Sequence, residues 1–269
     1  LPFLLPELRG TTDDIARHVA RGLPRLVETI DMQGDLHTHT TWSDGRDTLD
    51  AMVATAVDLG YRYLAITDHS ERALCSRTLS RSDVARQREA VRDIATRHPT
   101  ISLLHGVEVE IMPDGTLDFD DDLLASFDIV LASLHDHAGH SSARLLDRYL
   151  AAMAHPLVNV ITHPANRTPG QLNGYDLDFD TLIAAARESG TALEVDGAPG
   201  HLDMDGALAG RAVDAGVTVV IDSDAHRTEG LARQMAFGVG TARRGGVEPR
   251  HVLNTRPLDD IRQIGRAHV

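Results

Sequence analysis

Short apolar runs that end in His, Asp or Glu recur along the chain. They are rich in leucine and β-branched residues, as buried strands are, and a metal-capable side chain stands at the carboxyl end of each. We count seven strand candidates from residue 34 onward. The clearest are YLAITDH ending at His69, ISLLHGVE at Glu108, IVLASLH at His135, VNVITH at His163, and VTVVIDSDAH at Asp224 and His226.

Segments with helical character lie between these strands. Asp47 or Ser43 is expected to cap the first helix, and Ser141 or Ser142 the third. The alternation of strand and helix predicts parallel strands joined by right-handed crossovers. The predicted helices span residues 47–59, 82–97, 142–154, 178–189 and 206–215.

Two α/β architectures fit this alternation, a closed barrel and an open doubly wound sheet. Candidate ligands from almost every strand end must converge on one point, which a closed barrel allows and an open sheet does not. We therefore predict a barrel over residues 31–269. Residues 1–30 are predicted to be a helical lead-in, with Thr11 or Thr12 as a cap.

Composition narrows the class of protein. Of the 269 residues, 42% are hydrophobic and 25% charged, and no apolar run reaches the roughly 18 residues of a membrane helix. We expect a soluble, cytoplasmic protein without a signal peptide. The net charge is −14, and all 26 basic residues are Arg. Such a surface repels nucleic acid at long range, although three divalent cations would cancel about six negative charges locally.

Residues 34 to 45 read GDLHTHTTWSDG and carry the strongest chemical signal. In an extended segment alternate side chains share a face, so His37 and His39 point the same way, with the carboxylate of Asp44 a few residues later. The Asp-Gly pair at Asp44 is also typical of a turn, and the two roles are compatible. Two imidazoles and a carboxylate are the start of a metal site.

Two further strands leave a choice of carboxylate. In HGVEVEI, Glu108 and Glu110 face the same side, so alternation does not choose between them. Glu108 is favoured because it stands at the register of the other candidate ligands. Asp68 precedes His69 and points elsewhere in a continuing strand, so it is expected to support the ligands from outside.

Six histidines stand at strand ends, where burial beside apolar neighbours is unfavourable unless the imidazole has a partner. In SDAH, Asp224 and His226 share a face, and Asp222, one step deeper on that face, is the weaker candidate. With the carboxylates, the set is too large for one tetrahedral ion and predicts a cluster of two or three. The six histidines are His37, His39, His69, His135, His163 and His226.

Histidine and carboxylate ligands without thiolate favour Zn, Mn or Fe over calcium or soft copper, and ligand type does not separate those three. A cluster of this kind lowers the pKa of bound water towards about 7 and neutralises charge on a phosphoryl group during in-line displacement. Hydrolysis by an activated hydroxide is therefore the expected reaction.

The ordered motifs resemble the PHP family, named for polymerase and histidinol phosphatase. HTHTTWSDG, ITDHS, GVE, SLH, THP and SDAH occur in the family's order over residues 34–226. LPELRG, ITHPANR, NGYDLD, LEVDGAP and VLNTRPL are similar to the carboxyl-terminal PHP domain of bacterial family X DNA polymerases. The resemblance implies a distorted (β/α)7 barrel with three divalent metal ions, usually manganese, at the carboxyl ends of the strands.

The resemblance also assigns residues. Glu108 would bridge two metals, and Glu108, His135 and Asp68 are the candidate catalytic residues. Arg167, Arg72, Arg77, Arg81 and His201 are candidate contacts for the substrate phosphate, although the polymerase members carry Arg where this chain has His201. The implied metal ligands are His37, His39, Asp44, His69, Glu108, His135, His163, Asp224 and His226.

Three functions follow as hypotheses. The first is a metal-dependent phosphoesterase acting on DNA 3′ ends, as a 3′ to 5′ exonuclease or 3′-phosphatase in DNA repair, beside a polymerase domain or partner. The second is a phosphatase for a small molecule such as a nucleotide, sugar phosphate or histidinol phosphate. The third is a non-catalytic, metal-stabilised scaffold for a polymerase, which would need no full ligand set. The chain has no nucleotidyltransferase motif, so polymerisation by the chain alone is excluded.

Overall fold

The computed structural model describes residues 4–9, 15–16, 20, 22–135 and 139–264. The helix expected after Thr11 or Thr12 lies largely outside these residues. Within the lead-in, the described elements are two short 3-10 helices, η1 (Pro6–Leu8) and η2 (Thr29–Asp31). Among the described helices, none has the length and apolarity needed to cross a membrane.

Seven parallel strands form one sheet in simple sequence order. The first and last strands meet beyond their regular ends, where Thr38 pairs with Ala225 and the His39 N–H donates to the Ala225 carbonyl at 3.0 Å. This closure confirms the predicted (β/α)7 barrel and excludes the open sheet. The strands are β1 (Gly34–Asp35), β2 (Tyr63–Ile66), β3 (Ser102–Glu110), β4 (Ile129–Ser133), β5 (Val160–Ile161), β6 (Ala192–Asp196) and β7 (Val219–Asp222).

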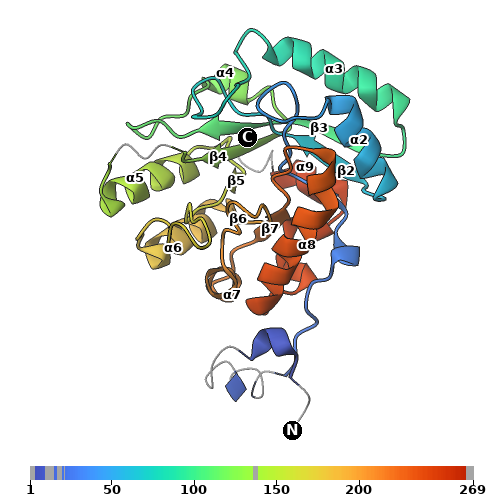
Figure 1. The fold of residues 1–269 in the computed structure, drawn as a ribbon. Coiled ribbons are helices and arrows are strands. Elements are labelled where there is room, and N and C mark those ends of the chain that lie inside the picture. Colours follow the sequence, from blue (N-terminus) through green and yellow to red (C-terminus); the bar gives the residue numbers. More distant parts are fainter. Residues whose placement is uncertain (1–3, 10–14, 17–19, 21, 136–138, 265–269) are drawn as a thin grey trace.

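Helices surround the sheet and alternate with its strands (Figure 1). The five predicted helices are present within two residues of their expected bounds. Ser141 caps α5 by accepting from the Arg144 N–H, whereas Thr48, rather than Asp47 or Ser43, caps α2 through the Ala51 N–H. The described helices are α2 (Leu49–Asp58), α3 (Val84–Arg97), α4 (Asp121–Leu124), α5 (Ser142–Met153), α6 (Phe179–Ser189), α7 (Gly206–Asp214), α8 (Thr228–Arg244) and α9 (Leu258–Ile264).

The longest helix, α8, was not predicted from the sequence. It contains three glycines, which lower helix propensity. The packing explains one of them, because a Cβ added at Gly238 would lie 2.8 Å from the Ile221 side chain of β7 and 3.2 Å from the Val195 carbonyl of β6. Gly238 therefore lets α8 approach the sheet closely, a requirement that local propensity does not reveal.

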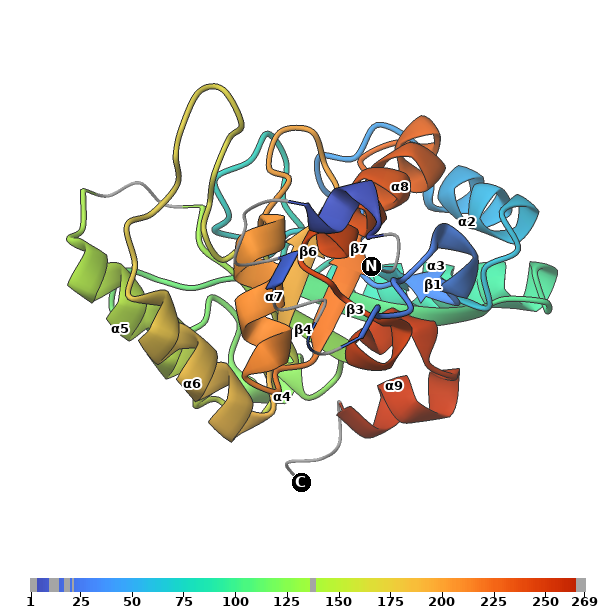
Figure 2. The ribbon, with the colours of Figure 1, turned by 90° about the horizontal axis from the view of Figure 1, so that it is seen from below.

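The inner and outer faces of the strands bury separate apolar clusters. In β2, Tyr63 and Ala65 belong to the inner cluster, whereas Leu64 and Ile66 pack with the surrounding helices. Leu253 and Ile261, from the segment after α8, join the inner cluster and close the amino-terminal end of the barrel. Figure 2 shows α9 on one side of the barrel and the long loops that follow the strands on the other. The inner face at that loop end is left for polar side chains.

Candidate metal centre

The predicted ligands converge at the carboxyl ends of the strands. At least one of them comes from the segment after β1 and from the end of each of the strands β2, β3, β4, β5 and β7. All nine contact another member of the set, and most are buried. The nine are His37, His39, Asp44, His69, Glu108, His135, His163, Asp224 and His226.

Glu108 occupies the middle of this set. Its side chain is 1% exposed, and imidazoles approach both of its oxygens. Since the two oxygens face different histidines, this carboxylate is suited to bridge two cations. His163 Nε2 and His135 Nε2 lie 3.1 and 3.6 Å from Oε1, and His69 Nδ1, His37 Nε2 and His39 Nε2 lie 2.8, 3.2 and 3.4 Å from Oε2.

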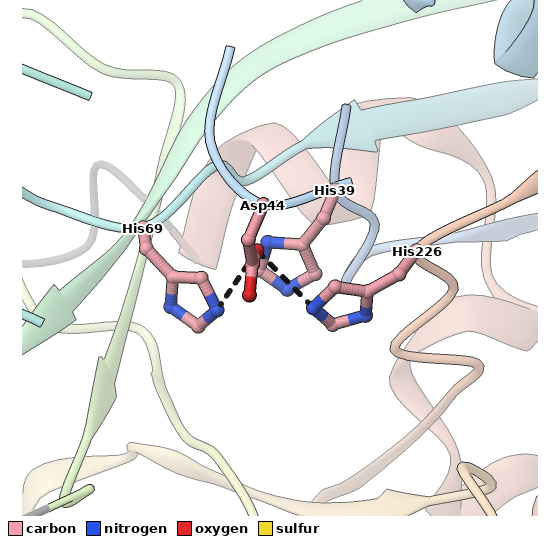
Figure 3. Close-up of side chains that lie close together, drawn as sticks. All are labelled: His39, Asp44, His69 and His226. Atoms are coloured by element: carbon pink, nitrogen blue, oxygen red, sulfur yellow. Dashed lines mark ion pairs between the residues drawn. The ribbon is translucent and has the colours of Figure 1, made fainter. Parts of the chain in front are cut away.

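A second group forms around Asp44, on the turn after the first histidines (Figure 3). Asp44 Oδ1 lies 3.6 Å from His69 Nε2 and 3.3 Å from His226 Nε2. The His39 ring stacks between its neighbours, with centroids 4.3 Å from His69 and 4.2 Å from His226. The four side chains can therefore direct one ligand atom each at a common point.

Asp224 joins the first two histidines into a third group. Its Oδ1 lies 3.0 Å from His39 Nε2 and 3.6 Å from His37 Nε2, and the two Nε2 atoms are 3.0 Å apart. On the far side of its ring, His37 Nδ1 lies 2.6 Å from Glu194 Oε1. Because a carboxylate only accepts, Glu194 keeps a proton on Nδ1 and turns the Nε2 lone pair towards the group.

The side chains alone leave ligand atoms unsatisfied, which fits a site for cations. Among the described residues, Glu108 Oε2, His69 Nδ1 and His163 Nδ1 are buried without a hydrogen-bond partner. His69 Nδ1 and Glu108 Oε2 are only 2.8 Å apart, yet their orientation is not that of a hydrogen bond. Buried polar atoms are rarely left unpaired, and a divalent cation would pair Glu108 Oε2 and His69 Nδ1.

Charges within the group shift its pKa values in opposite directions. Burial opposes ionisation of Asp44, but hydrogen bonding to His226 and the charge of His69 lower its pKa to about 2. Burial lowers the pKa of His135, but Glu108 and Glu110 outweigh it and raise the pKa to about 9. In the same way, Asp224 and Asp44 overcome the burial of His226 and raise its pKa to about 9. Protons on these imidazoles therefore compete with cations for the nitrogen lone pairs.

Metal affinity is accordingly expected to rise with pH. Because the pKa of His135 and of His226 is about 9, both imidazoles are protonated at lower pH and must release protons when a cation binds. Calorimetric titration of chelator-treated protein with Mn2+, in buffers of different ionisation enthalpy, measures this release directly. The same affinity at pH 6.5 as at pH 8.5, with no proton release, would contradict the assignment of these two histidines.

Asp68 lies outside the contacts of the cluster. Its carboxylate accepts hydrogen bonds from Thr40 and Ser43, each through both the backbone N–H and the hydroxyl, at 2.6–3.1 Å. It is fully buried. Asp68 therefore fixes the turn that carries Asp44, and its catalytic role stays a prediction.

A directed chain of hydrogen bonds holds Asp68 from behind. Gln87 Nε2 donates to Asp68 Oδ2 at 2.7 Å, and Gln87 Oε1 lies 2.9 Å from His105 Nε2. Arg88 Nε donates to His105 Nδ1 at 3.3 Å, which leaves the His105 proton on Nε2, facing Gln87. Each donor thus meets an acceptor, and the hydrogen bonds run in one direction, from Arg88 on α3 inward to Asp68.

Replacing Gln87 by Leu is expected to weaken metal binding and hydrolysis by about 10-fold to 100-fold, the usual effect of losing a group that orients ligands. The reason is that Asp68 loses a buried donor and the Asp44 turn loosens. Gln263→Leu, at an exposed site on α9, is the matched control. Equal metal affinity and turnover in the two variants would remove this role from Gln87.

The four arginines that are candidate phosphate contacts divide into two pairs. Arg81 Nη1 is bound to Asp120 at 2.6 Å and its other nitrogen donates to the Asp118 carbonyl, so the structure uses it to hold that loop. Arg72 has a 68% exposed side chain, and its Nε lies 3.8 Å from Asp118 Oδ1. Neither arginine contacts the cluster.

Arg77 and Arg167 belong to segments that adjoin predicted metal ligands. Arg77 Nη2 donates to the carbonyl of Gly45, the residue after Asp44, at 3.1 Å. Arg167 follows His163 in the loop after β5, and its Nη1 lies 3.3 Å from Asp205 Oδ2. Of the four candidate arginines, these two lie on or are bonded to segments that carry a predicted ligand.

His201 also lies beside the ligands. Its ring stacks on His163 with centroids 4.8 Å apart. Burial and the neighbouring His163 lower its pKa to about 4, so the imidazole is neutral near pH 7.

Three buried carboxylates lie beneath the ligands, and of these the sequence analysis considered only Asp222. Glu194 binds His37 and also accepts from the His163 N–H at 2.8 Å. Asp222, ranked only as a weaker ligand, accepts from the Leu36 N–H at 2.8 Å, and Asp35 accepts from the Ser223 N–H at 3.2 Å. The period of two in LEVD places Glu194 on the inner face and was the available signal.

Known proteins resemble this chain in sequence and in fold. The DNA polymerase/3′-5′ exonuclease PolX of Bacillus subtilis is 38% identical over 97% of this chain, and the chain spans 45% of that protein. A chain of Syntrophotalea carbinolica named "Probable phosphatase" is 26% identical over 85% of this chain and 94% of its own length. The structure of histidinol phosphate phosphatase from Lactococcus lactis, complexed with zinc, L-histidinol and phosphate, matches with a TM-score of 0.58 at 16% identity. It covers 81% of this chain and 95% of that one, and supports the fold.

A family model extends this resemblance to the site. The model described as PHP domain matches residues 35–196, from β1 to the end of β6. This stretch holds seven of the nine converging ligands, and the remaining two follow β7. Both the predicted family and the predicted enzyme class, a hydrolase of phosphoric esters that depends on metal, are confirmed by this match and by the PolX relative. The chain belongs to the PHP domain family of metal-dependent phosphoesterases.

Proposed function

We propose that this phosphoesterase acts on DNA 3′ ends, as a 3′ to 5′ exonuclease or 3′-phosphatase. The observation that carries the proposal is the 38% identity to PolX, which extends over 97% of the chain and so reaches beyond the residues of the family model. The phosphatases that match over 75% to 94% of their own length are 26% to 30% identical. The acidic surface is compatible with DNA because bound cations offset the charge around the site.

Three divalent ions, with Mn2+ the proposed activating metal and Zn2+ or Fe2+ as alternatives, fit the three groups of side chains. Such ions activate water and neutralise charge on the phosphoryl group. Glu108 is proposed to serve two groups through its two oxygens, as the contacts of its Oε1 and Oε2 indicate. With His39 assigned to one ion only, the three proposed sets of ligands are His37, His39, Glu108 and Asp224; Glu108, His135 and His163; and Asp44, His69 and His226.

The chain's own residues prepare the site for an anionic ester. Glu194 and Glu110 hold the Nδ1 atoms of His37 and His135, at 2.6 and 2.8 Å, so that each Nε2 faces Glu108. Asp68 fixes the turn that carries Asp44. Arg77 and Arg167 are proposed to contact the phosphate from the loops around the cluster, since arginine forms paired hydrogen bonds with phosphate oxygens.

The test compares three substrates. Protein loaded with Mn2+ is incubated with a 5′-labelled single-stranded oligonucleotide, with the same oligonucleotide bearing a 3′-phosphate, and with AMP, each with and without chelator. Stepwise shortening, or loss of the 3′-phosphate alone, supports action on DNA ends. Glu108→Gln protein is the control for a contaminating nuclease. Phosphate release from AMP without any change in the oligonucleotides contradicts the proposal.

A small-molecule phosphatase is the second candidate. It is favoured by the relative from Syntrophotalea carbinolica, since this chain matches nearly the whole of that protein. The net charge of −14 and the absence of lysine also suit a small substrate better than a long polyanion. If the metal-loaded protein hydrolysed none of the substrates, the result would instead support a non-catalytic, metal-stabilised scaffold for a polymerase.

A further inference from the structure

The loop after β6 brings two ligand-type side chains together beside the cluster. Asp196, the last residue of β6, donates its N–H to the Asp203 carbonyl, and its Oδ1 accepts from the Ala198 N–H at 2.5 Å. The His201 N–H donates to the Ala198 carbonyl at 2.9 Å, which turns the loop back on itself. These backbone bonds place His201 next to Asp196 even though four residues separate them.

Each of the two side chains keeps a buried polar atom without a partner. Asp196 Oδ2 and His201 Nδ1 have no hydrogen-bond partner among the described residues, and Asp196 is 0% exposed. Asp224 and Glu194 are the neighbouring carboxylates whose charges act on Asp196. An additional carboxylate here, with no arginine bonded to it, needs a positive partner to remain charged.

We propose that Asp196, His201 and Asp224 bind a divalent cation at a further site, in addition to the three groups described above. One ligand atom from each of the three lies within 4.8 Å of the other two. Asp224 then connects the new site to the group of His37 and His39, which its Oδ1 contacts. Two carboxylates and one imidazole suit Mn2+, Fe2+ or Zn2+, and three protein ligands leave coordination positions open.

The His163 ring covers one face of His201, at 4.8 Å between centroids, and restrains its orientation. The loop of Arg167 is tied to the same loop after β6, because the Arg167 backbone N–H donates to Asp203 Oδ2 at 3.3 Å. A cation at this site would add positive charge near the place where Arg167 is proposed to contact a phosphate. The inference rests on Asp224 being a metal ligand, as in the proposed function, but not on the identity of the ester.

The test counts ions rather than product. The full chain is saturated with Mn2+ and dialysed, and the ions per chain are measured by native mass spectrometry and elemental analysis. The wild type is expected to bind one more ion than Asp196→Asn, which keeps the size of the side chain but removes its charge. His201→Gln is expected to show the same loss of one ion. Asp205→Asn, an equal change of charge at a half-exposed residue nearby, keeps the wild-type count.

Equal counts in the wild type, Asp196→Asn and His201→Gln would overturn the proposal and make Asp196 a neutral hydrogen-bonding acid. If Asp196→Asn does not fold, His201→Gln decides alone. Anomalous scattering from crystals of the Mn2+ protein gives an independent result, since a peak bounded by Asp196 and His201 supports the site and peaks confined to the other groups reject it. Loss of all ions from the wild type would instead defeat the metal centre as a whole.

Discussion

Glu108→Gln is expected to lower hydrolysis by about 1,000-fold or more, because the carboxylate supports two cation groups at once. Gln keeps the shape of the side chain but removes one negative charge and replaces one acceptor oxygen by a donor. Five imidazole nitrogens lie within 3.6 Å of the Glu108 oxygens, so the change reaches most of the site. Single-turnover hydrolysis with saturating Mn2+ measures the loss, and elemental analysis shows whether ions are lost with it.

Glu110→Gln is the matched control for this variant. It lies two residues along the same strand on the same inner face, but among the described residues its carboxylate is engaged only with His135, through the ring at 2.8 Å and the backbone N–H at 3.1 Å. Losing this orienting group is expected to lower activity by only about 10-fold to 100-fold. If the two variants were equally impaired, the central position assigned to Glu108 would be wrong.

The apolar runs predicted the barrel because they carry two kinds of information. Their length and β-branched content indicate buried parallel strands, and the polar residue at the end of each run indicates which end of the barrel holds the site. Glu108 and Glu110 show the limit of what the sequence pattern predicts about the ligands. Alternation places both on the inner face, and only the register against the neighbouring strands puts Glu108 among the histidines.

Interactions across distant parts of the chain could not be predicted in the same way. Glu194 orients His37 across 157 positions of sequence, and Gln87 supports Asp68 from a helix that periodicity describes only as amphipathic. The arginines show the same limit. Arg81 resembles a phosphate ligand by type, but the acidic loop after β3 already pairs with it. Residue type and spacing identify candidate ligands, whereas tertiary contacts decide which of them remain available.

The double variant His37→Ala, His39→Ala is expected to lose bound metal and hydrolysis while keeping the barrel. Both imidazoles point into the cluster, and both are 0% exposed, so their loss removes two ligands and leaves Asp224 without His39, its nearest imidazole at 3.0 Å. The apolar clusters inside and around the sheet involve neither residue, and they account for most of the packing. Circular dichroism is therefore expected to stay close to that of the wild type.

Thermal unfolding separates loss of metal from loss of fold in this variant. A ligand that binds only the folded state stabilises it by about 2.7 kcal/mol at 100 times its dissociation constant, so Mn2+ should raise the melting temperature of the wild type. The double variant should show little of this increase. His98→Ala, His155→Ala is the control, since these histidines lie at helix ends and contact only Asp50 and Asp121 among the carboxylates. A double variant that kept both its Mn2+-dependent stabilisation and its turnover would refute the placement of the metal centre.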